Sequence, residues 1–82
     1  MAAGNTPTSL DAILSGQKIH SRIKQSGHSI SEIQEMLGLE CPQSIYRWHK
    51  GQSMPSIDNL YMLSQILEVH MEDLLVSMDA AK

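Results

Sequence analysis

A chain of 82 residues with 41% hydrophobic residues supports one small domain, and its single cysteine excludes an internal disulfide. Apolar runs reach two or three residues, far short of the roughly 20 that a membrane helix needs, and no secretory leader is present, so we expect a cytoplasmic protein. The net charge of -3 argues mildly against a nucleic-acid partner, because neutralisation of phosphates dominates such affinities.

The apolar residues are mainly Leu, Ile and Met, phenylalanine is absent, and no strand-like alternation occurs. We therefore predict an all-α fold. Residues 1–9 are small, polar and turn-prone, so we expect them to be disordered. The domain should cover 10–78, followed by a frayed tail at 79–82.

The first apolar stripes lie over 10–14 and 19–23, on different faces of a helix, with Ser15-Gly16 between them. This change of face predicts a short or irregular leading turn. A helix over about 16–26 should follow and end at Gly27.

A short helix of about two turns is predicted after Ser29. Ser29 and Glu32 have the spacing of a capping box, in which each side chain accepts a hydrogen bond from the other residue's backbone N–H. Apolar residues then recur at helical spacing, and Gly38 follows where a left-handed residue ends a helix.

A second short helix is predicted over about 42–50. Pro42 suits the first helical position, Cys41 replaces the usual capping residue, and Gly51 ends the helix. Cys41 and the four histidines lack the close paired spacing of zinc sites, so we expect no metal.

This helix has two different faces. Ile45, Trp48 and His49 fall on one side, and we expect Trp48 to point to the core. The other side is polar and carries no acid, and its members are Gln43, Tyr46, Arg47 and Lys50. Arginine and glutamine match the guanine and adenine edges in the major groove, although a polar face is also often merely solvated.

Charge is distributed unevenly along the chain. Residues 16–55 carry five cations and three acids, whereas the rest carries one cation and six acids. This concentration of cations weakens the objection that the net charge raises against a nucleic-acid partner.

Two further helices are predicted over 58–67 and about 71–78. The last one should bury Leu74 and Leu75. Its apolar residues Met71, Leu75 and Met78 either form a dimer surface or complete the core of the monomer, and the sequence leaves both open.

Together these segments resemble the phage-repressor and Cro-like family, also called the Xre family. The supporting motifs are Gly16-x-x-Ile19, Leu37-Gly38, Ile45-x-x-Trp48-x-x-Gly51-x-x-x-Pro55 and Leu60-x-x-Leu63-x-x-x-Leu67-x-Val69-x-x-x-x-Leu74. The resemblance implies a five-helix lambda-repressor-like fold whose second and third helices form a helix-turn-helix.

The resemblance also implies which residues touch DNA. Base contacts fall on Gln43, Ser44 and Arg47, with Tyr46 and Lys50 beside them near bases or phosphates. We further expect phosphate contacts from Ser29, Ser31, Gln52 and Ser53. Two features depart from the family pattern: Ile30 replaces a common glutamine, and the turn before Ile45 is one residue longer.

These observations predict a sequence-specific regulator of transcription that binds double-stranded DNA, acts as a repressor, and works as a homodimer on an inverted repeat. The alternative is a helix-turn-helix module that binds a protein, such as an antitoxin or an accessory subunit. Catalysis needs a nucleophile, a base and a pocket, which a small bundle offers poorly, so we expect no enzyme. We expect no cofactor and no small-molecule ligand.

Overall fold

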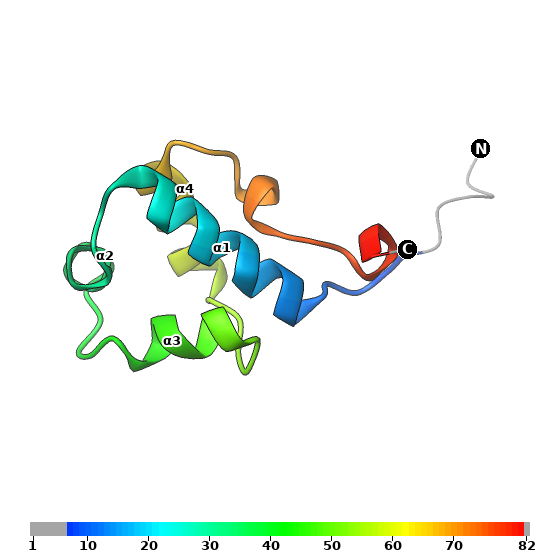
Figure 1. Cartoon of the computed structure of the whole chain (residues 1–82), viewed down its shortest axis with the longest axis horizontal. Coiled ribbons are helices and arrows are strands. Elements are labelled where there is room, and N and C mark those ends of the chain that lie inside the picture. The colour runs from blue at the N-terminus through cyan, green and yellow to red at the C-terminus, as the bar shows by residue number, and fades with distance from the viewer. Residues whose placement is uncertain (1–6, 82) are drawn as a thin grey trace.

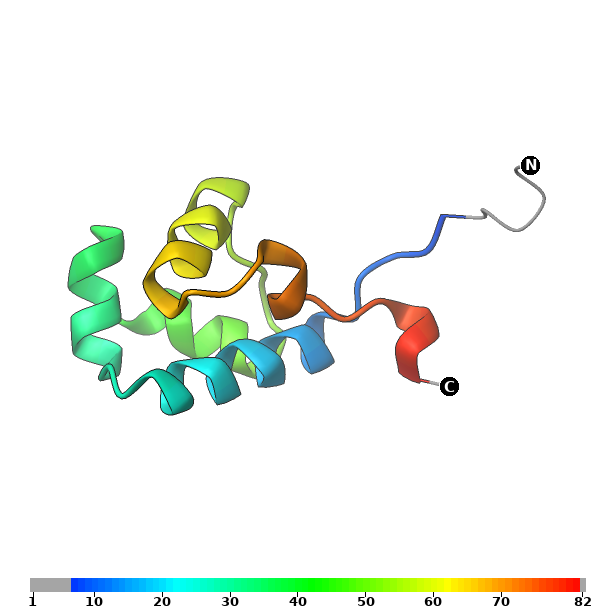
Figure 2. The same cartoon turned by 90° about the horizontal axis from the view of Figure 1, so that it is seen from above.

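The computed structural model describes residues 7–81, which form four α-helices and two short 3-10 helices (Figures 1 and 2). They are α1 (Ala12–Ser26), α2 (Ile30–Leu37), α3 (Gln43–Lys50), α4 (Ile57–Leu67), η1 (Met71–Leu74) and η2 (Met78–Ala81). Over this range the only β-type pairing is an isolated bridge between Leu10 and Ser77. The predicted all-α class is confirmed, with four α-helices rather than five among the described residues.

The core is formed by one cluster to which all four α-helices and η1 contribute. Its buried members are Ile19, Ile23, Ile33, Leu37, Ile45, Trp48, Leu60, Leu63 and Leu74. In Figure 1, α1 crosses the middle of the molecule, α3 lies along one side of it, and α2 is seen nearly end-on. Removing these apolar side chains from water is the main stabilising term, at about 25 cal/mol per Å².

Helix α1 begins at Ala12, four residues before the predicted start. Asp11 caps it, since its Oδ1 accepts a hydrogen bond from the Leu14 N–H at 2.9 Å. Ser15 and Gly16 do not interrupt the helix. The prediction of an irregular leading turn was therefore wrong, because these two small residues face a neighbouring segment closely instead of breaking the helix.

The close approach at Gly16 joins α1 to α3. A Cβ atom at this position would clash with the carbonyl oxygen of Trp48. Ser15 is fully buried, and its hydroxyl accepts from the Val76 N–H at 2.8 Å and donates to the Val76 carbonyl at 3.3 Å. Small side chains are thus required on this face of α1.

The predicted helix over 71–78 was wrong in form. Over residues 71–77 only η1 is helical, and the backbone of Leu75, which follows it, is extended. The next residue, Val76, is held beside the start of α1, because its carbonyl accepts from the Asp11 N–H at 2.7 Å and its N–H donates to Ser15. These contacts replace the hydrogen bonds that would have continued the helix.

The segment just before α1 and the segment just after η1 lie side by side (Figures 1 and 2). The Ser9 carbonyl accepts from the Met78 N–H at 2.9 Å. Of the segment that we expected to be disordered, residues 1–6 lie outside the described residues, and so does Lys82 of the expected tail. No helix within 7–81 is long and apolar enough to span a bilayer.

Candidate nucleic-acid interface

Helix α3 has one buried face and one exposed face. Ile45 and Trp48 are 0% and 3% exposed, so the prediction that Trp48 points to the core is confirmed. On the other side Ser44 is half-buried, and the exposed residues are Gln43, Tyr46, Arg47 and Lys50. Burial of the first face fixes the direction in which the second face points.

The exposed polar groups of α3 are not used by the protein itself. Within the described part of the chain, the side chains of Gln43, Arg47 and Lys50 form no hydrogen bond or ion pair. No acidic side chain occurs on α3. Two cations and an amide are therefore available to an external partner with hydrogen-bond acceptors.

The start of α3 differs from the prediction. The helix begins at Gln43, Pro42 occupies the capping position, and no side chain caps the helix. Cys41 is exposed and makes no capping hydrogen bond, so its predicted role as a cap was wrong. A thiol is only a weak hydrogen-bond acceptor. Proline has no backbone N–H, so Pro42 does not need a hydrogen-bond partner for one.

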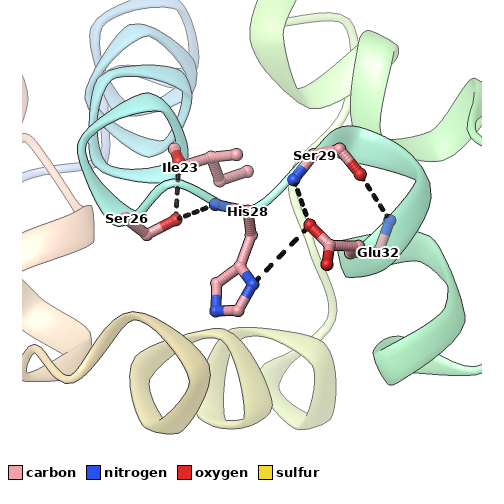
Figure 3. Close-up of polar contacts among 5 residues, drawn as sticks. All are labelled: Ile23, Ser26, His28, Ser29 and Glu32. Atoms are coloured by element: carbon pink, nitrogen blue, oxygen red, sulfur yellow. Dashed lines mark hydrogen bonds and ion pairs between the residues drawn. The ribbon is translucent and has the colours of Figure 1, made fainter.

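The start of α2 is held by a polar network (Figure 3). The predicted capping box is confirmed: the Ser29 N–H donates to Glu32 Oε1 at 2.7 Å, and the Glu32 N–H donates to Ser29 Oγ at 3.1 Å. His28 Nδ1 lies 3.9 Å from the same carboxylate oxygen. The preceding turn is closed by Ser26 Oγ, which accepts from the His28 N–H and donates to the Ile23 carbonyl.

This network places a negative charge at the start of α2. The pKa of Glu32 is lowered, mainly because the backbone N–H of Ser29 donates to the carboxylate, with smaller contributions from the Ser29 hydroxyl and the charge of His28. The carboxylate is therefore ionised at neutral pH. It lies where the family resemblance places a phosphate, and it would repel one.

The remaining predicted phosphate contacts come from separate elements. Ser31 is exposed in the first turn of α2. Gln52 and Ser53 are exposed in the loop after α3, and the Gln52 N–H donates to the Arg47 carbonyl at 2.9 Å. The fold thus gathers the five predicted α3 residues on one helix and leaves the four phosphate candidates on its flanks.

One side-chain contact near the C-terminal end of α3 was not predicted from the sequence. His49 Nδ1 lies 3.0 Å from His20 Nδ1 on α1, and the two rings meet edge to face with centroids 4.3 Å apart. Burial, followed by the charge of His20, lowers the pKa of His49 to about 4. The helical period predicted that His49 faces inward, but no sequence signal pairs it with a residue 29 positions earlier.

The scattered cysteine and histidines do not assemble into a larger cluster. Over the described residues, no three side chains among His, Cys, Asp and Glu are placed to hold a metal ion together.

Comparison with known families gives a match over most of this domain. The sequence family described as Helix-turn-helix matches residues 19–74, which include α2, the turn and α3. The chain belongs to the Cro/C1-type helix-turn-helix family. Among curated proteins, none matches this helix-turn-helix chain significantly.

Three solved structures are similar to this helix-turn-helix protein. The restriction-modification controller protein C.AhdI from Aeromonas hydrophila superposes with a TM-score of 0.69 at 22% identity, over 78% of this chain and 96% of that one. The P22 c2 repressor, solved with a synthetic operator, gives 0.66 at 25% identity, over 73% and 89%. SinR, a master regulator for biofilm formation solved with DNA, gives 0.65 at 30% identity, over 73% and 95%.

Proposed function

We propose that this protein is a sequence-specific transcription regulator of the cytoplasm that binds double-stranded DNA and represses transcription. The observation that carries the proposal is the exposed face of α3, where unpaired cationic and amide side chains stand on a helix whose other face is locked in the core. The P22 c2 repressor and SinR, which share the fold, were solved with an operator and with DNA. No enzymatic activity, cofactor or small ligand is part of the proposal.

In this proposal α3 enters the major groove and its exposed side chains read base edges. Arg47 donates two hydrogen bonds from its planar guanidinium to a guanine, and Gln43 pairs with an adenine. Each such bidentate contact contributes about 1–3 kcal/mol of discrimination between bases. Ser44 reaches a third base from the same side of the helix.

Contacts to phosphates fix the position of α3. Tyr46 and Lys50 lie beside the base-reading residues, near bases or phosphates. The flanking phosphate contacts come from Ser29, Ser31, Gln52 and Ser53, all of which are exposed. Such contacts set the register of the protein on the duplex without reading its sequence.

A homodimer is part of the proposal, because one short helix spans too few base pairs for a unique operator. Two copies would place their α3 helices on half-sites about 34 Å apart in an inverted repeat. Of the three residues weighed for the dimer surface, Met71 and Leu75 pack against the monomer core, whereas Met78 is 54% exposed. Met78 is therefore the one we expect the second copy to cover.

The ionic-strength dependence of binding to a short duplex tests this function against the alternative of a protein-binding module. We expect the affinity to fall steeply with salt, because each neutralised phosphate releases counterions. Lys50→Ala should lower the slope of log K against log salt by about one.

Arg22→Ala is the matched control, since it removes the same charge. Arg22 lies away from α3, in a surface hollow with Gln65, Glu68 and Asp73. We expect this variant to keep the slope of the parent. A parent protein that shows no salt-dependent binding to DNA would support the protein-binding module instead.

A further inference from the structure

The contact between His20 and His49 ties α3 to α1. Among the described residues it is the only side-chain hydrogen bond that joins these two helices. Its two Nδ1 atoms are 3.0 Å apart, a distance that requires one nitrogen to donate and the other to accept. The contact therefore depends on where the protons of the two rings are.

The surroundings of the two rings decide which Nδ1 donates and which accepts. His20 is exposed, so its Nε2 can exchange hydrogen bonds with water, whereas His49 Nε2 is buried and has no partner in the described part of the chain. A buried N–H without an acceptor is costly. The favourable neutral arrangement has His49 donating from Nδ1–H to the bare Nδ1 of His20, with the Nε2 of His49 unprotonated.

An added proton is costly in this geometry. On His20 Nδ1 it would either place two N–H groups against each other or shift His49 to its Nε2–H tautomer, which buries an N–H without an acceptor. On His49 Nε2 it would bury a charged donor without an acceptor. The aromatic rings beside His49 are those of His20 and, edge to face, Tyr46. Neither α1 nor α3 contains a carboxylate, and their charged side chains are Lys18, Arg22, Lys24, Arg47 and Lys50.

We propose that His20 and His49 are positioning residues that hold the recognition helix α3 on α1 through a proton-sensitive link. The link forms when the pair carries no added proton and is lost when it takes one up. Acidification therefore weakens the docking of α3, and with it the presentation of the face that reads DNA. The last step rests on the proposed function, but the docking step does not.

The direction of the pH effect follows from linkage. The pKa of His49 is lowered from 6.5 to about 4 in the folded chain, first by burial and then by the charge of His20. Between these two pH values the unfolded chain binds more protons at His49 than the folded chain does. His49 therefore does not lower the free energy of unfolding above pH 6.5, and it lowers that free energy progressively as the pH drops toward 4.

The first test is a nitrogen-15 NMR titration of the histidine rings in the unmodified chain, which requires no variant to fold. We expect His49 to stay neutral as the Nδ1–H tautomer at about pH 5, because its pKa is lowered from 6.5 to about 4. A His49 ring that is half charged near its ordinary pKa of 6.5, or that is protonated on Nε2 at neutral pH, would overturn the proposal.

The second test measures chemical unfolding against pH. His49→Asn keeps an N–H donor near the Nδ1 position but cannot titrate, and His70→Asn is the matched control. Between about pH 7 and about pH 5 we expect the unfolding equilibrium constant to rise about tenfold more in the parent than in His49→Asn, while His70→Asn behaves as the parent. Equal pH dependence in parent and His49→Asn would overturn the link.

Binding to a short duplex at fixed ionic strength, at the same two pH values, connects the link to function. We expect the parent to lose more affinity on acidification than His49→Asn, and an equal loss would overturn the step from docking to DNA reading. If neither protein binds DNA at either pH, the proposed function fails, and the NMR and unfolding results still decide the link.

Discussion

At the scale of single residues, Glu32 has two opposing effects. Its carboxylate completes the capping box of α2 and so stabilises the helix start. The same negative charge stands beside Ser29 and Ser31, where the proposed function requires phosphates. Because its pKa is lowered, it stays ionised well into the acidic range, and its contribution to stability is lost only as the pH falls through that lowered pKa.

Glu32→Gln should therefore strengthen DNA binding. Glutamine preserves the capping box, because its side-chain oxygen also accepts from the Ser29 N–H. We expect the affinity for every duplex to rise by about two- to fivefold at low salt, without a change in base preference, because only repulsion of phosphates is removed. Fluorescence anisotropy with specific and unrelated duplexes measures this.

Glu35→Gln removes the same charge from an exposed position further along α2 and is the control. It should raise the affinity less than Glu32→Gln. Equal gains in the two variants would mean that net charge alone is responsible, and that α2 does not place its start against a phosphate.

Individual residues were predictable where one helix decides their environment. The capping box of Ser29 and Glu32 and the inward direction of Trp48 follow from spacing within one helix. The pairing of His20 with His49 was not predictable, because it depends on how two helices cross. Cys41 was wrongly predicted to cap α3, because the helix starts one residue later than expected. The DNA contacts of Gln43, Ser44 and Arg47 stay predictions.

At the scale of elements, the crossing of α1 and α3 depends on Gly16. Gly16→Ala should destabilise the domain by about 1–3 kcal/mol, because the new methyl group meets the backbone carbonyl of Trp48, which cannot turn away as a side chain can. Chemical unfolding measures the loss. Gln17→Ala, on the exposed side of the same helix, should change the stability by less than about 0.5 kcal/mol.

The same crossing also connects stability with the position of α3. If Gly16→Ala proved as stable as Gln17→Ala, the two helices would not be in the close contact that fixes the exposed face of α3.

Elements were predictable when local signals set both of their ends. Helices α2 and α3 end at the predicted glycines, and α4 begins one residue before its predicted start, where Ser56 Oγ accepts from the Asn59 N–H. The start of α1 was missed although Asp11 is a local capping signal, because Ser15-Gly16 suggested a break in the helix. The end of η1 was not predictable, because Val76 is held by Ser15 through hydrogen bonds that span more than 60 positions. Gly16 was misleading, since a glycine at a close contact looks like a helix breaker in sequence.

At the scale of the whole molecule, charge is segregated along the chain. The net charge is -3, yet α1 and α3 carry no acid, and six of the nine acids lie outside residues 16–55. Such segregation favours one orientation of the protein toward a polyanion and disfavours the opposite one. The helix-turn-helix class was predictable because its motifs are short and local, whereas the operator and the dimer surface depend on a second molecule.

Selection of bound duplexes from a randomised pool, at about 0.1 M salt, tests the reading of DNA by α3 most directly. The parent protein should enrich an inverted repeat, Arg22→Ala should enrich the same one, and Arg47→Ala should lose the preference at one base pair of each half-site while keeping its thermal stability. No enriched sequence with the parent, or the same enriched repeat with Arg47→Ala, would contradict the assignment of α3 as the recognition helix and of Arg47 as its reader.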